Sequence, residues 1–484
     1  MATYYMRADG TAANKAAATG PSSNVAACMN VTVHNGETFS ANDIIILSDV
    51  GGTYRTQMNC PSSGTAGNPI TYQAEGAPIL SGFDIMTGFA DGGSNIWDKT
   101  GVTTQPLGTI VNGAPMKKMA ASRAACTAAG DWFWTANTLS VYATSDPSGN
   151  VEAGQRDRAI DGGVHDNLTF TDLTITGAND TGILIRAGSN ILLDGMTVVQ
   201  NPGVGVELLA GTDAVTIQNC TLDRSGAVNL LLLDGPAATN FSLLSTTVSD
   251  SGWRDLSAGN CSGMSGYIAS GEIAYNTFTD NGAVATSEVG TEHGIYQGAV
   301  DGCTATCHHN TVTGTTKGYG IKWQGSGTVY SNTLDDNRAG IMVGVNGTFN
   351  ATATVRHNVI ANSWGTGIVQ QAKGSGTLTV KLYHNTVYNS ETHAFGNAGG
   401  YEIEDALTVL DVRNNIFSIG GSGRMVWLKV TQTGTVTINY NDVYDPGEAT
   451  LYRIGAVEMD LATWQSNGYD ANGFNSDPLF VNPT

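Results

Sequence analysis

Between residues 254 and 322 the chain carries four side chains that could together move protons and neutralise a carboxylate: Arg254, His293, Tyr296 and Lys322. Lysine, histidine and tyrosine act as general bases or acids once their surroundings tune their pKa values. Arginine holds a carboxylate through two parallel hydrogen bonds. This combination fits a β-elimination on an acidic sugar, with Lys322 or His293 as the base, Tyr296 as the acid and Arg254 as the clamp on the carboxylate.

Further polar and aromatic residues flank these four and are candidates for contacts with a substrate. They are Trp253, Asp255, Glu292, Tyr319 and Trp323. The tryptophans could stack on the faces of sugar rings. The two carboxylates, Asp255 and Glu292, support an alternative chemistry, because hydrolysis of a glycosidic bond with inversion uses a pair of acidic side chains. At this point both chemistries remain open.

A repeated phrase explains how residues so far apart in sequence could meet. An Asn followed two places later by an apolar residue recurs about every 22 to 34 residues, a period typical of a solenoid. The copies are Asn276-Thr277-Phe278, Asn310-Thr311-Val312, Asn332-Thr333-Leu334, Asn358-Val359-Ile360, Asn385-Thr386-Val387, Asn415-Ile416-Phe417 and Asn441-Asp442-Val443. The apolar position continues upstream as Ile175, Val198, Leu222 and Val248.

Each repeat holds short runs with period-2 alternation, separated by turn residues and without a helix between them. Such units can stack at the strand spacing of about 4.8 Å, so that equivalent residues form columns. We therefore predict an all-β, single right-handed parallel β-helix with caps at both ends. Its asparagines should form a ladder at a turn, a slot that Leu173, Met196, Cys220 and Thr246 fill in the earlier coils. An antiparallel sandwich is the alternative, but sandwiches lack a phased repeat.

Alignment of the repeats fixes the direction of two candidate side chains. Gly294-Ile295-Tyr296 matches Gly320-Ile321-Lys322, and alternation turns the Ile residues inward. Tyr296 and Lys322 should therefore point outward from adjacent coils. The next outward residues in this column, Met342 and Val369, are chemically inert.

The same alignment gathers the remaining candidates beside two long connections, residues 258–271 and 283–291. His293 and Tyr319 each precede the aligned glycine, and Arg254 aligns with His293 one coil earlier. Long loops on a rigid scaffold are where function usually lies. We therefore expect the substrate to cross these coils between the two connections.

The chain is divided into four parts that we expect to form one domain. Residues 1–82 should be the N-terminal cap and first coils, 83–160 a side excursion packed on them, 161–445 the regular coils, and 446–484 the C-terminal cap. The excursion contains a hairpin pattern over residues 131–142. A helix is predicted over residues 459–466.

Short sequence motifs near both ends of the chain resemble those of one superfamily. They are Gly51-Gly52-Thr53-Tyr54-Arg55, Gly67-Asn68-Pro69-Ile70-Thr71-Tyr72, Pro78-Ile79-Leu80-Ser81-Gly82 and Asp477-Pro478-Leu479-Phe480-Val481. They look like the first coils and closing segment of right-handed parallel β-helix (pectin-lyase-like) proteins that act on polysaccharides. These include the chondroitinase B and alginate lyase group and the mannuronan epimerases. The resemblance implies this fold and a polysaccharide substrate.

The catalytic motifs of these families are incomplete in this chain. Lys322 can be placed on the lysine of the chondroitinase B type, but Met342-Val343-Gly344 stands where that type has Leu-Arg-His-Gly. Thr315-Thr316-Lys317 replaces its acidic calcium-binding residues, and the Asp-Pro-His-Asp signature of the epimerases is absent. The resemblance therefore implies fold and substrate class but not a mechanism.

Charge and composition restrict the partners. The chain of 484 residues has a formal net charge of −20, which disfavours nucleic acid, and no apolar run of membrane-spanning length. Met1–Tyr5 is not a signal peptide. We expect a monomer or homotrimer that is extracellular, with its signal absent from this chain, or virion-associated. A non-catalytic adhesin or phage tail-spike is thus a third interpretation.

The sequence gives only weak indications of metal binding. No cofactor is certain. Ca²⁺ is considered at Glu402, Glu404 and Asp405, although a solvated loop is the favoured interpretation. Zinc at Cys303 and the neighbouring Cys307-His308-His309 is disfavoured because a second ligand pair is lacking.

Overall fold

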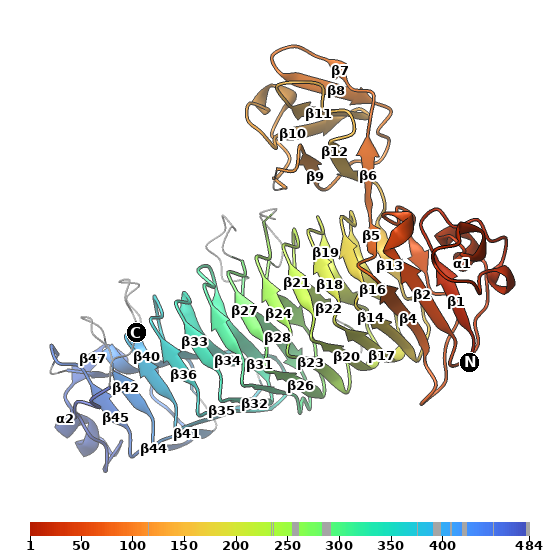
Figure 1. Cartoon of the computed structure of the whole chain (residues 1–484). Coiled ribbons are helices and arrows are strands. Elements are labelled where there is room, and N and C mark those ends of the chain that lie inside the picture. Colours follow the sequence, from red (N-terminus) through yellow and green to blue (C-terminus); the bar gives the residue numbers. More distant parts are fainter. Residues whose placement is uncertain are drawn as a thin grey trace. The chain divides into compact units, whose positions relative to one another are not determined.

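The computed structural model describes residues 1–114, 116–233, 235, 237–253, 261–282, 292–374, 376–390, 398–406, 409–418, 424–448 and 450–480. The chain forms two compact units (Figure 1). Unit 1 consists mainly of residues 1–233 and 246–253, and unit 2 mainly of residues 237–245, 262–282 and 292–480. Three sheets of short strands, named here A, B and C, recur in both units.

In unit 1 the first two turns lack a strand in at least one sheet, whereas from residue 70 onward each turn contributes one strand to each sheet, and neighbouring strands pair in parallel. Sheet A contains β1 (Thr3–Met6), β2 (Ile44–Ser48), β4 (Ile70–Glu75), β14 (Leu168–Thr171), β17 (Ser189–Asp194) and β20 (Asp213–Gln218). Sheet B contains β5 (Ile79–Ser81), β15 (Thr174–Thr176), β18 (Thr197–Val199), β21 (Thr221–Asp223) and β24 (Thr247–Ser249). Sheet C contains β3 (Met58–Asn59), β13 (Arg158–Asp161), β16 (Thr181–Ile185), β19 (Val204–Leu208) and β22 (Leu230–Leu232).

Unit 2 repeats the same arrangement. Its sheet A contains β23 (Phe241–Leu244), β26 (Gly271–Ala274), β29 (Thr306–His308), β32 (Gly327–Tyr330), β35 (Ala351–Arg356), β38 (Leu378–Tyr383), β41 (Val409–Arg413) and β44 (Thr435–Asn439). Its sheet B contains β27 (Thr277–Thr279), β30 (Thr311–Thr313), β33 (Thr333–Asp335), β36 (Val359–Ala361), β39 (Thr386–Tyr388), β42 (Ile416–Ser418) and β45 (Asp442–Tyr444). Its sheet C contains β25 (Met264–Gly266), β28 (Ile295–Val300), β31 (Tyr319–Gly325), β34 (Ala339–Gly347), β37 (Ile368–Gly374), β40 (Ala398–Ile403), β43 (Arg424–Leu428), β46 (Tyr452–Ile454) and β47 (Val457–Met459).

The predicted apolar column is confirmed within each unit. In unit 1 Ile175 pairs with Val198, and Leu222 with Val248. In unit 2 the register continues from strand to strand and includes Phe278, Val312, Leu334, Ile360, Val387, Phe417 and Val443. All of these side chains are buried. The fold is the predicted all-β parallel solenoid, with about 14 turns when both units are taken together.

The asparagine ladder is also confirmed, and it runs through unit 2. Each Nδ2 from Asn276 to Asn415 donates to the Oδ1 of the asparagine one coil on, at 2.9–3.0 Å. Asn441 ends the series by donating to Oδ2 of Asp470 in the C-terminal cap, at 3.3 Å. The ladder thus satisfies side-chain amides that are 1–2% exposed.

A residue with positive φ stands immediately before each ladder asparagine and turns the chain from sheet A to sheet B. Non-glycine residues occupy it, including Tyr275 (φ 61°), His309 (54°), His357 (57°) and His384 (54°). This left-handed conformation costs a non-glycine residue about 1–2 kcal/mol. It turns the chain sharply, and His309, His357 and His384 are exposed there.

A small lobe interrupts the repeat in unit 1. It is built from β6 (Phe83–Met86), β7 (Ala90–Asp91), β8 (Ile96–Thr100), β9 (Thr109–Val111), β10 (Trp132–Thr135), β11 (Thr138–Tyr142) and β12 (Val151–Gly154). The predicted hairpin is present as the antiparallel pair β10–β11. The lobe has its own apolar core, centred on Trp132, and it contacts the coils where Asn179 accepts a hydrogen bond from the Leu107 N–H at 2.5 Å.

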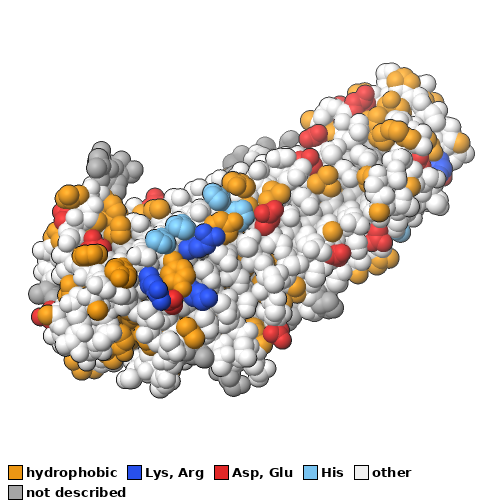
Figure 2. Space-filling view, turned by 90° about the horizontal axis from the view of Figure 1, so that it is seen from below, with side chains coloured by type: hydrophobic (Ala, Val, Ile, Leu, Met, Phe, Trp, Pro, Cys, Tyr) orange, Lys and Arg blue, Asp and Glu red, His pale blue; other side chains and the backbone are white. Residues whose placement is uncertain are grey.

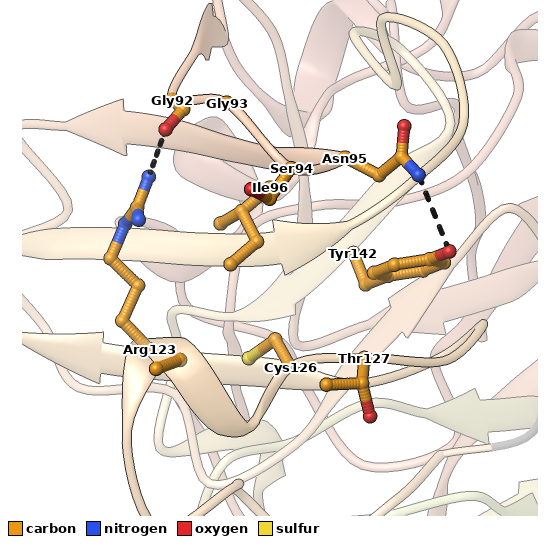
Figure 3. A pocket seen from close by; sticks show the side chains of 10 residues that line it. Gly92, Gly93, Ser94, Asn95, Ile96, Arg123, Cys126, Thr127 and Tyr142 are labelled. Atoms are coloured by element: carbon orange, nitrogen blue, oxygen red, sulfur yellow. Dashed lines mark hydrogen bonds between the residues drawn. The ribbon is translucent and has the colours of Figure 1, made fainter.

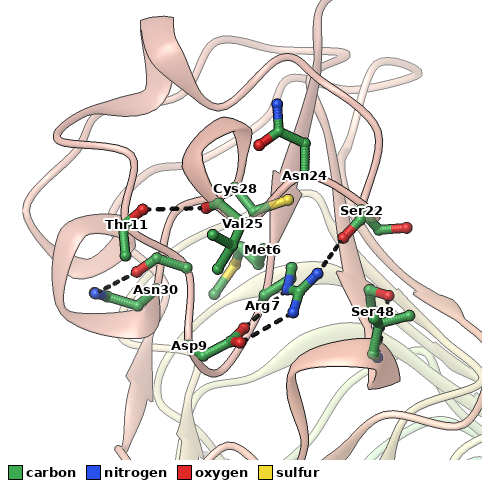
Figure 4. Close-up of polar contacts among 12 residues, drawn as sticks. Met6, Arg7, Asp9, Thr11, Ser22, Asn24, Val25, Cys28, Asn30 and Ser48 are labelled. Carbon is green, nitrogen blue, oxygen red and sulfur yellow. Dashed lines mark hydrogen bonds and ion pairs between the residues drawn. The ribbon is translucent and has the colours of Figure 1, made fainter.

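Short helices close the two ends of the chain. The N-terminal cap contains 3₁₀ turns at Lys15–Ala17 and Val25–Ala27 and the helix α1 (Val31–Asn35), and α2 (Leu461–Ser466) lies in the C-terminal cap. Arg7 holds the first cap together by donating to both carboxylate oxygens of Asp9 and to the Ser22 carbonyl (Figure 4). No helix in the described ranges is long and apolar enough to cross a membrane.

Candidate active site

The outward column of sheet C in unit 2 carries the predicted proton-transfer residues. Tyr296 pairs with Lys322, Lys322 with Met342 and Met342 with Val369, so the predicted register is correct. The Lys322 ammonium lies 5.0 Å from the centroid of the Tyr296 ring. A cation at this distance from an aromatic face is attracted to it. The strand geometry alone therefore places an amine and a phenol in contact.

Gln324 holds the hydroxyl group of Tyr296. The hydroxyl donates to Oε1 of Gln324 at 3.0 Å. Gln324 is two residues beyond Lys322 on the same strand, so it lies on the same outward side. Because an amide oxygen can only accept, this contact favours the protonated form of Tyr296. Sequence reasoning missed Gln324, although the same alternation that oriented Lys322 could have found it.

His293 lies beneath this pair with its ring 5.6 Å from the rings of both Tyr296 and Tyr319. The imidazole is buried, and its Nδ1 accepts the backbone N–H of Tyr319 at 3.1 Å. A neutral ring with this partner carries its proton on Nε2. The neutral ring of His293 therefore has no lone pair left with which to accept a proton, so His293 is not the base.

Tyr319 links the pair to further charged residues in unit 2. Burial, helped by Glu404 and Glu402, raises its pKa to about 12, and Arg338 and Lys429 oppose this shift. Tyr319 thus keeps its proton at neutral pH. Its electrostatic neighbours also identify Arg338 and Lys429 as cations of this face, which sequence reasoning had not singled out.

Lys429 neutralises the acidic group for which Ca²⁺ was considered. Its ammonium contacts the carboxylates of Glu402 and Glu404, the latter at 2.9 Å. Burial lowers the pKa of Lys429, but its hydrogen bonds to the two carboxylates outweigh burial and raise it overall. A lysine therefore occupies the position between the acids that a calcium ion would need. The described ranges contain no group of three or more His, Cys, Asp or Glu residues suited to hold a metal ion.

Two expectations about substrate contacts are wrong. Trp323 is completely buried, and its indole donates to the Ser326 carbonyl at 2.9 Å. Alternation explains this, because Trp323 follows the outward Lys322 and must turn inward. Glu292 is also fully buried, so it does not present a carboxylate to a ligand at the surface.

Arg254 and Asp255 lie outside the described residues, as do residues 258–260 and 283–291 of the two long connections. The remainder of the first connection contains a strand of sheet C, β25 (Met264–Gly266). Trp253 belongs to unit 1 and is half-buried, with its indole donating to the Arg224 carbonyl at 3.0 Å. Met342 and Val369 are buried despite their outward direction.

The lobe of unit 1 contains a separate hollow of about 560 Å³ (Figure 3). Tyr142 and Asn95 line one side of it, with Asn95 Nδ2 3.5 Å from the Tyr142 hydroxyl. Arg123 lines the other side, but its guanidinium is engaged by Asp98 at 2.7 Å and by the Gly92 carbonyl at 3.0 Å. None of the predicted site residues lines this hollow.

Comparison with known proteins agrees with the architecture. A family model described as "Right handed beta helix region" matches residues 159–343. No curated protein sequence matches this chain significantly. The fold and this match define the class of protein, a right-handed parallel β-helix protein.

Among solved structures, the chain is similar to XylC in complex with xylose, with a TM-score of 0.57, 13% identity and coverage of 93% of this chain and 86% of that chain. It is also similar to a lacto-N-biosidase from Eubacterium ramulus (TM-score 0.45, 12% identity, 95% of this chain and 67% of that chain). An alginate lyase from Paenibacillus sp. str. FPU-7 follows with a TM-score of 0.40, 14% identity and coverage of 72% and 97%. At 13% identity the likeness to XylC supports the fold alone, and the other two structures, with TM-scores below 0.5, are reported as similarities only.

Proposed function

We propose that this protein is a polysaccharide lyase that cleaves an acidic polysaccharide on the outward face of sheet C. The observation that carries the proposal is the contact between Lys322 and Tyr296, with their side chains 5.0 Å apart as measured from Nζ to the ring centroid. His293 and Tyr319 adjoin the pair. Together these four residues provide a base, an acid and supporting polar groups within two consecutive turns.

The proposed reaction is an elimination in which Lys322, in its neutral form, removes the proton next to the uronate carboxylate. The electron pair forms a carbon–carbon double bond, and the glycosidic carbon–oxygen bond breaks. Tyr296 gives its proton to the leaving oxygen, which balances the reaction. His293 is buried beneath the pair and positions Tyr319 by accepting its backbone N–H at Nδ1.

Arg338 is the described cation best suited to neutralise the uronate carboxylate. It lies close enough to Tyr319 to oppose the rise in the pKa of that residue. Its Nη1 donates to the Lys317 carbonyl at 3.2 Å, which fixes the guanidinium beside the outward column. Arg254, which we assigned to this role from the sequence, stays a prediction.

Hydrolysis by paired carboxylates finds less support on this face. Glu292 is buried, and the acidic pair formed by Glu402 and Glu404 is neutralised by Lys429. A hydrolase needs one carboxylic acid whose pKa is raised enough to protonate the leaving group. The ion pairs with Lys429 already engage both of these carboxylates.

Incubation with a panel of acidic and neutral polysaccharides tests the proposal. A lyase produces an unsaturated uronate that absorbs in the ultraviolet, together with new reducing ends. New reducing ends without that absorbance would identify a hydrolase instead. Binding without either product would support the adhesin or tail-spike interpretation. A polysaccharide ligand is also why we propose an extracellular or virion-associated location.

A further inference from the structure

The outer surface of sheet A in unit 2 carries a second group of aromatic and basic side chains. On successive strands β29, β32, β35 and β38 the register aligns His308, Tyr330, Arg356 and Tyr383. The positive-φ turns that follow three of these strands add His309, His357 and His384, and Tyr275 precedes them after β26. We call these eight residues the sheet A strip. Figure 2 shows His, Lys and Arg side chains gathered beside apolar ones on one face.

Rings in the strip are stacked in pairs from neighbouring coils. His357 lies over His384 at 5.1 Å and 7°, and Tyr275 over His309 at 5.0 Å and 19°. His309, His357 and His384 are exposed, and Tyr275 is 61% exposed. Flat, fixed and solvent-facing rings at the coil spacing of about 4.8 Å form a row of platforms for the apolar faces of sugar rings.

The strip contains one acidic contact, between Glu272 and His308 at 3.3 Å, and one arginine, Arg356, that forms no ion pair among the described residues. The Arg356 guanidinium lies 4.4 Å from the Tyr330 ring centroid and donates to Nδ1 of His357 at 3.2 Å. No described carboxylate forms an ion pair with Arg356. Arg413 in the next coil but one differs, because it pairs with Asp411 at 2.6 Å. Arg356 is therefore a cation held in place by a ring and an imidazole.

The titration of the histidines agrees with this charge balance. Burial, followed by the charges of His384 and Arg356, lowers the pKa of His357. An anion bound between Arg356 and His357 would reduce the repulsion between their positive charges. The other ionisable groups on the strands around His357 are Tyr330 on β32, Lys381 and Tyr383 on β38, and Asp411 and Arg413 on β41. Asp411 is already occupied by Arg413 and by the Tyr383 hydroxyl at 2.6 Å.

We propose that the sheet A strip is a second glycan-binding site, which takes an anionic polysaccharide running along the strip from coil to coil. Its carboxylate or sulfate groups pair with Arg356 and accept the Nε2–H that His357 carries while its Nδ1 accepts from Arg356, and its sugar rings stack on the exposed rings. The chain's net charge of −20 does not prevent this, because salt screens distant charges beyond about 8 Å. It does oppose a second copy as the occupant, because that copy carries the same charge. This binding does not require sheet C to be catalytic.

Affinity electrophoresis of the intact chain through gels containing polygalacturonate, dextran sulfate or neutral dextran tests the proposal. EDTA in the gel prevents histidine-bound metal from bridging to the glycan. The Lys322→Ala background keeps any substrate intact, and this residue lies on the other sheet. We expect retardation by both anionic polymers and none by dextran. If only one anionic polymer retards the protein, that result assigns the strip to carboxylate or to sulfate.

The substitutions are chosen so that the fold can accommodate them. Arg356→Gln should weaken binding about tenfold, the scale of one charge-assisted hydrogen bond. The double variant His357→Asn, His384→Asn is chosen because Asn414 holds the same turn position with φ 55°. Lys118→Gln, which removes one positive charge from the lobe, should leave binding unchanged.

The pH dependence gives an independent readout. An anion that neutralises Arg356 reduces the repulsion that helps to lower the pKa of His357, so affinity for polygalacturonate should rise as the pH falls below the ordinary imidazole value of about 6.5. The double Asn variant should lose most of this rise. Unchanged binding in both Arg356→Gln and the double variant would overturn the proposal, as would equal retardation by dextran or none by any polymer. A change of oligomeric state in Arg356→Gln would identify the strip as a contact between copies and would overturn it too.

Discussion

His293 accepts the backbone N–H of Tyr319 at Nδ1, across a distance of 3.1 Å. The bond joins two consecutive coils and fixes both the ring and the position of its proton. Since the neutral ring carries hydrogen on Nε2, it has no lone pair left with which to accept a proton. From the sequence, His293 and Lys322 were alternatives for the base. This hydrogen bond leaves the role of base to Lys322.

The first prediction is the shape of the pH–rate profile. If Lys322 is the base, kcat/KM should keep rising above pH 8, because the ordinary lysine pKa is about 10.4 and only the neutral amine accepts a proton. The profile should show no ascending step near the imidazole value of about 6.5. Measurement on a cleaved polysaccharide from pH 5 to 10 checks this. A step near 6.5 that His293→Gln removes would return the role of base to His293.

The second prediction concerns the two reacting side chains. Lys322→Ala and Tyr296→Phe should each lower kcat by about 10²-fold or more, the scale of losing a general base or acid. Neither side chain is part of the apolar core, so the free energy of unfolding should change by no more than about 0.5 kcal/mol. Lys118→Ala in the lobe is the control for loss of one positive charge. Full activity of both variants would rule out the lyase assignment.

The third prediction tests whether Lys429, and not a calcium ion, neutralises Glu402 and Glu404. Lys429→Ala should lower the free energy of unfolding at pH 7 by about 2 kcal/mol, because it leaves Glu402, which is 2% exposed, beside Glu404 without its partner. Calcium should raise the Tm of this variant and leave that of the parent unchanged. Thermal unfolding with calcium chloride or EDTA measures both. A calcium-dependent Tm in the parent would contradict the role given to Lys429.

The fourth prediction follows from the raised pKa of Lys429. Burial lowers this pKa, and the hydrogen bonds to Glu402 and Glu404 more than compensate. Because the folded pKa exceeds its ordinary value of 10.5, the stability that the lysine contributes is complete below that pH and is lost as pH rises through the folded pKa. The stability difference between the parent and Lys429→Ala should therefore be constant from pH 7 to 9 and shrink above pH 10.5. Denaturant unfolding at a series of pH values gives this difference directly.

The fifth prediction tests the core column. Val312→Asp places an unpaired charge between Phe278 and Leu334 and should cost several kcal/mol. Thr311→Asp on the same strand is the matched control, because Thr311 is exposed and should change stability by about 0.5 kcal/mol or less. Equal midpoints of denaturant unfolding for the two variants would contradict the inward direction of Val312.

The repeat made most of the fold predictable, because a shift of one residue would expose the column of Phe278, Val312 and Leu334. The same alternation predicted the contact between Tyr296 and Lys322. The same alternation also places Trp323 inward. We expected it to contact a substrate because tryptophan side chains stack on sugar rings. The row of His309, His357 and His384 was likewise present in the sequence, one place before each ladder asparagine.

Other contacts carry no periodic signature. The approach of Lys429 to Glu402 depends on a local irregularity in the pairing of β40 with β43, which shifts the register between Ala398 and Tyr401. The effect of Arg338 on Tyr319 depends on how long side chains lie across an outer face. Periodicity specifies the direction of a side chain but not the position of the end of a long one.

The asparagine ladder has a direction. Every Nδ2 donates toward the C-terminal end, and the last one meets Asp470, whose carboxylate oxygens accept from both the backbone N–H and the Nδ2 of Asn441. A coil inserted or removed in the interior therefore meets the same donor on one side and the same acceptor on the other. Deletion of residues 332–357, for example, would bring Asn310 to face Asn358 with an identical bond. Proteins of this design can thus gain or lose length by duplication or loss of whole coils. Their outer surface can become longer while the hydrogen bonds of the interior stay the same.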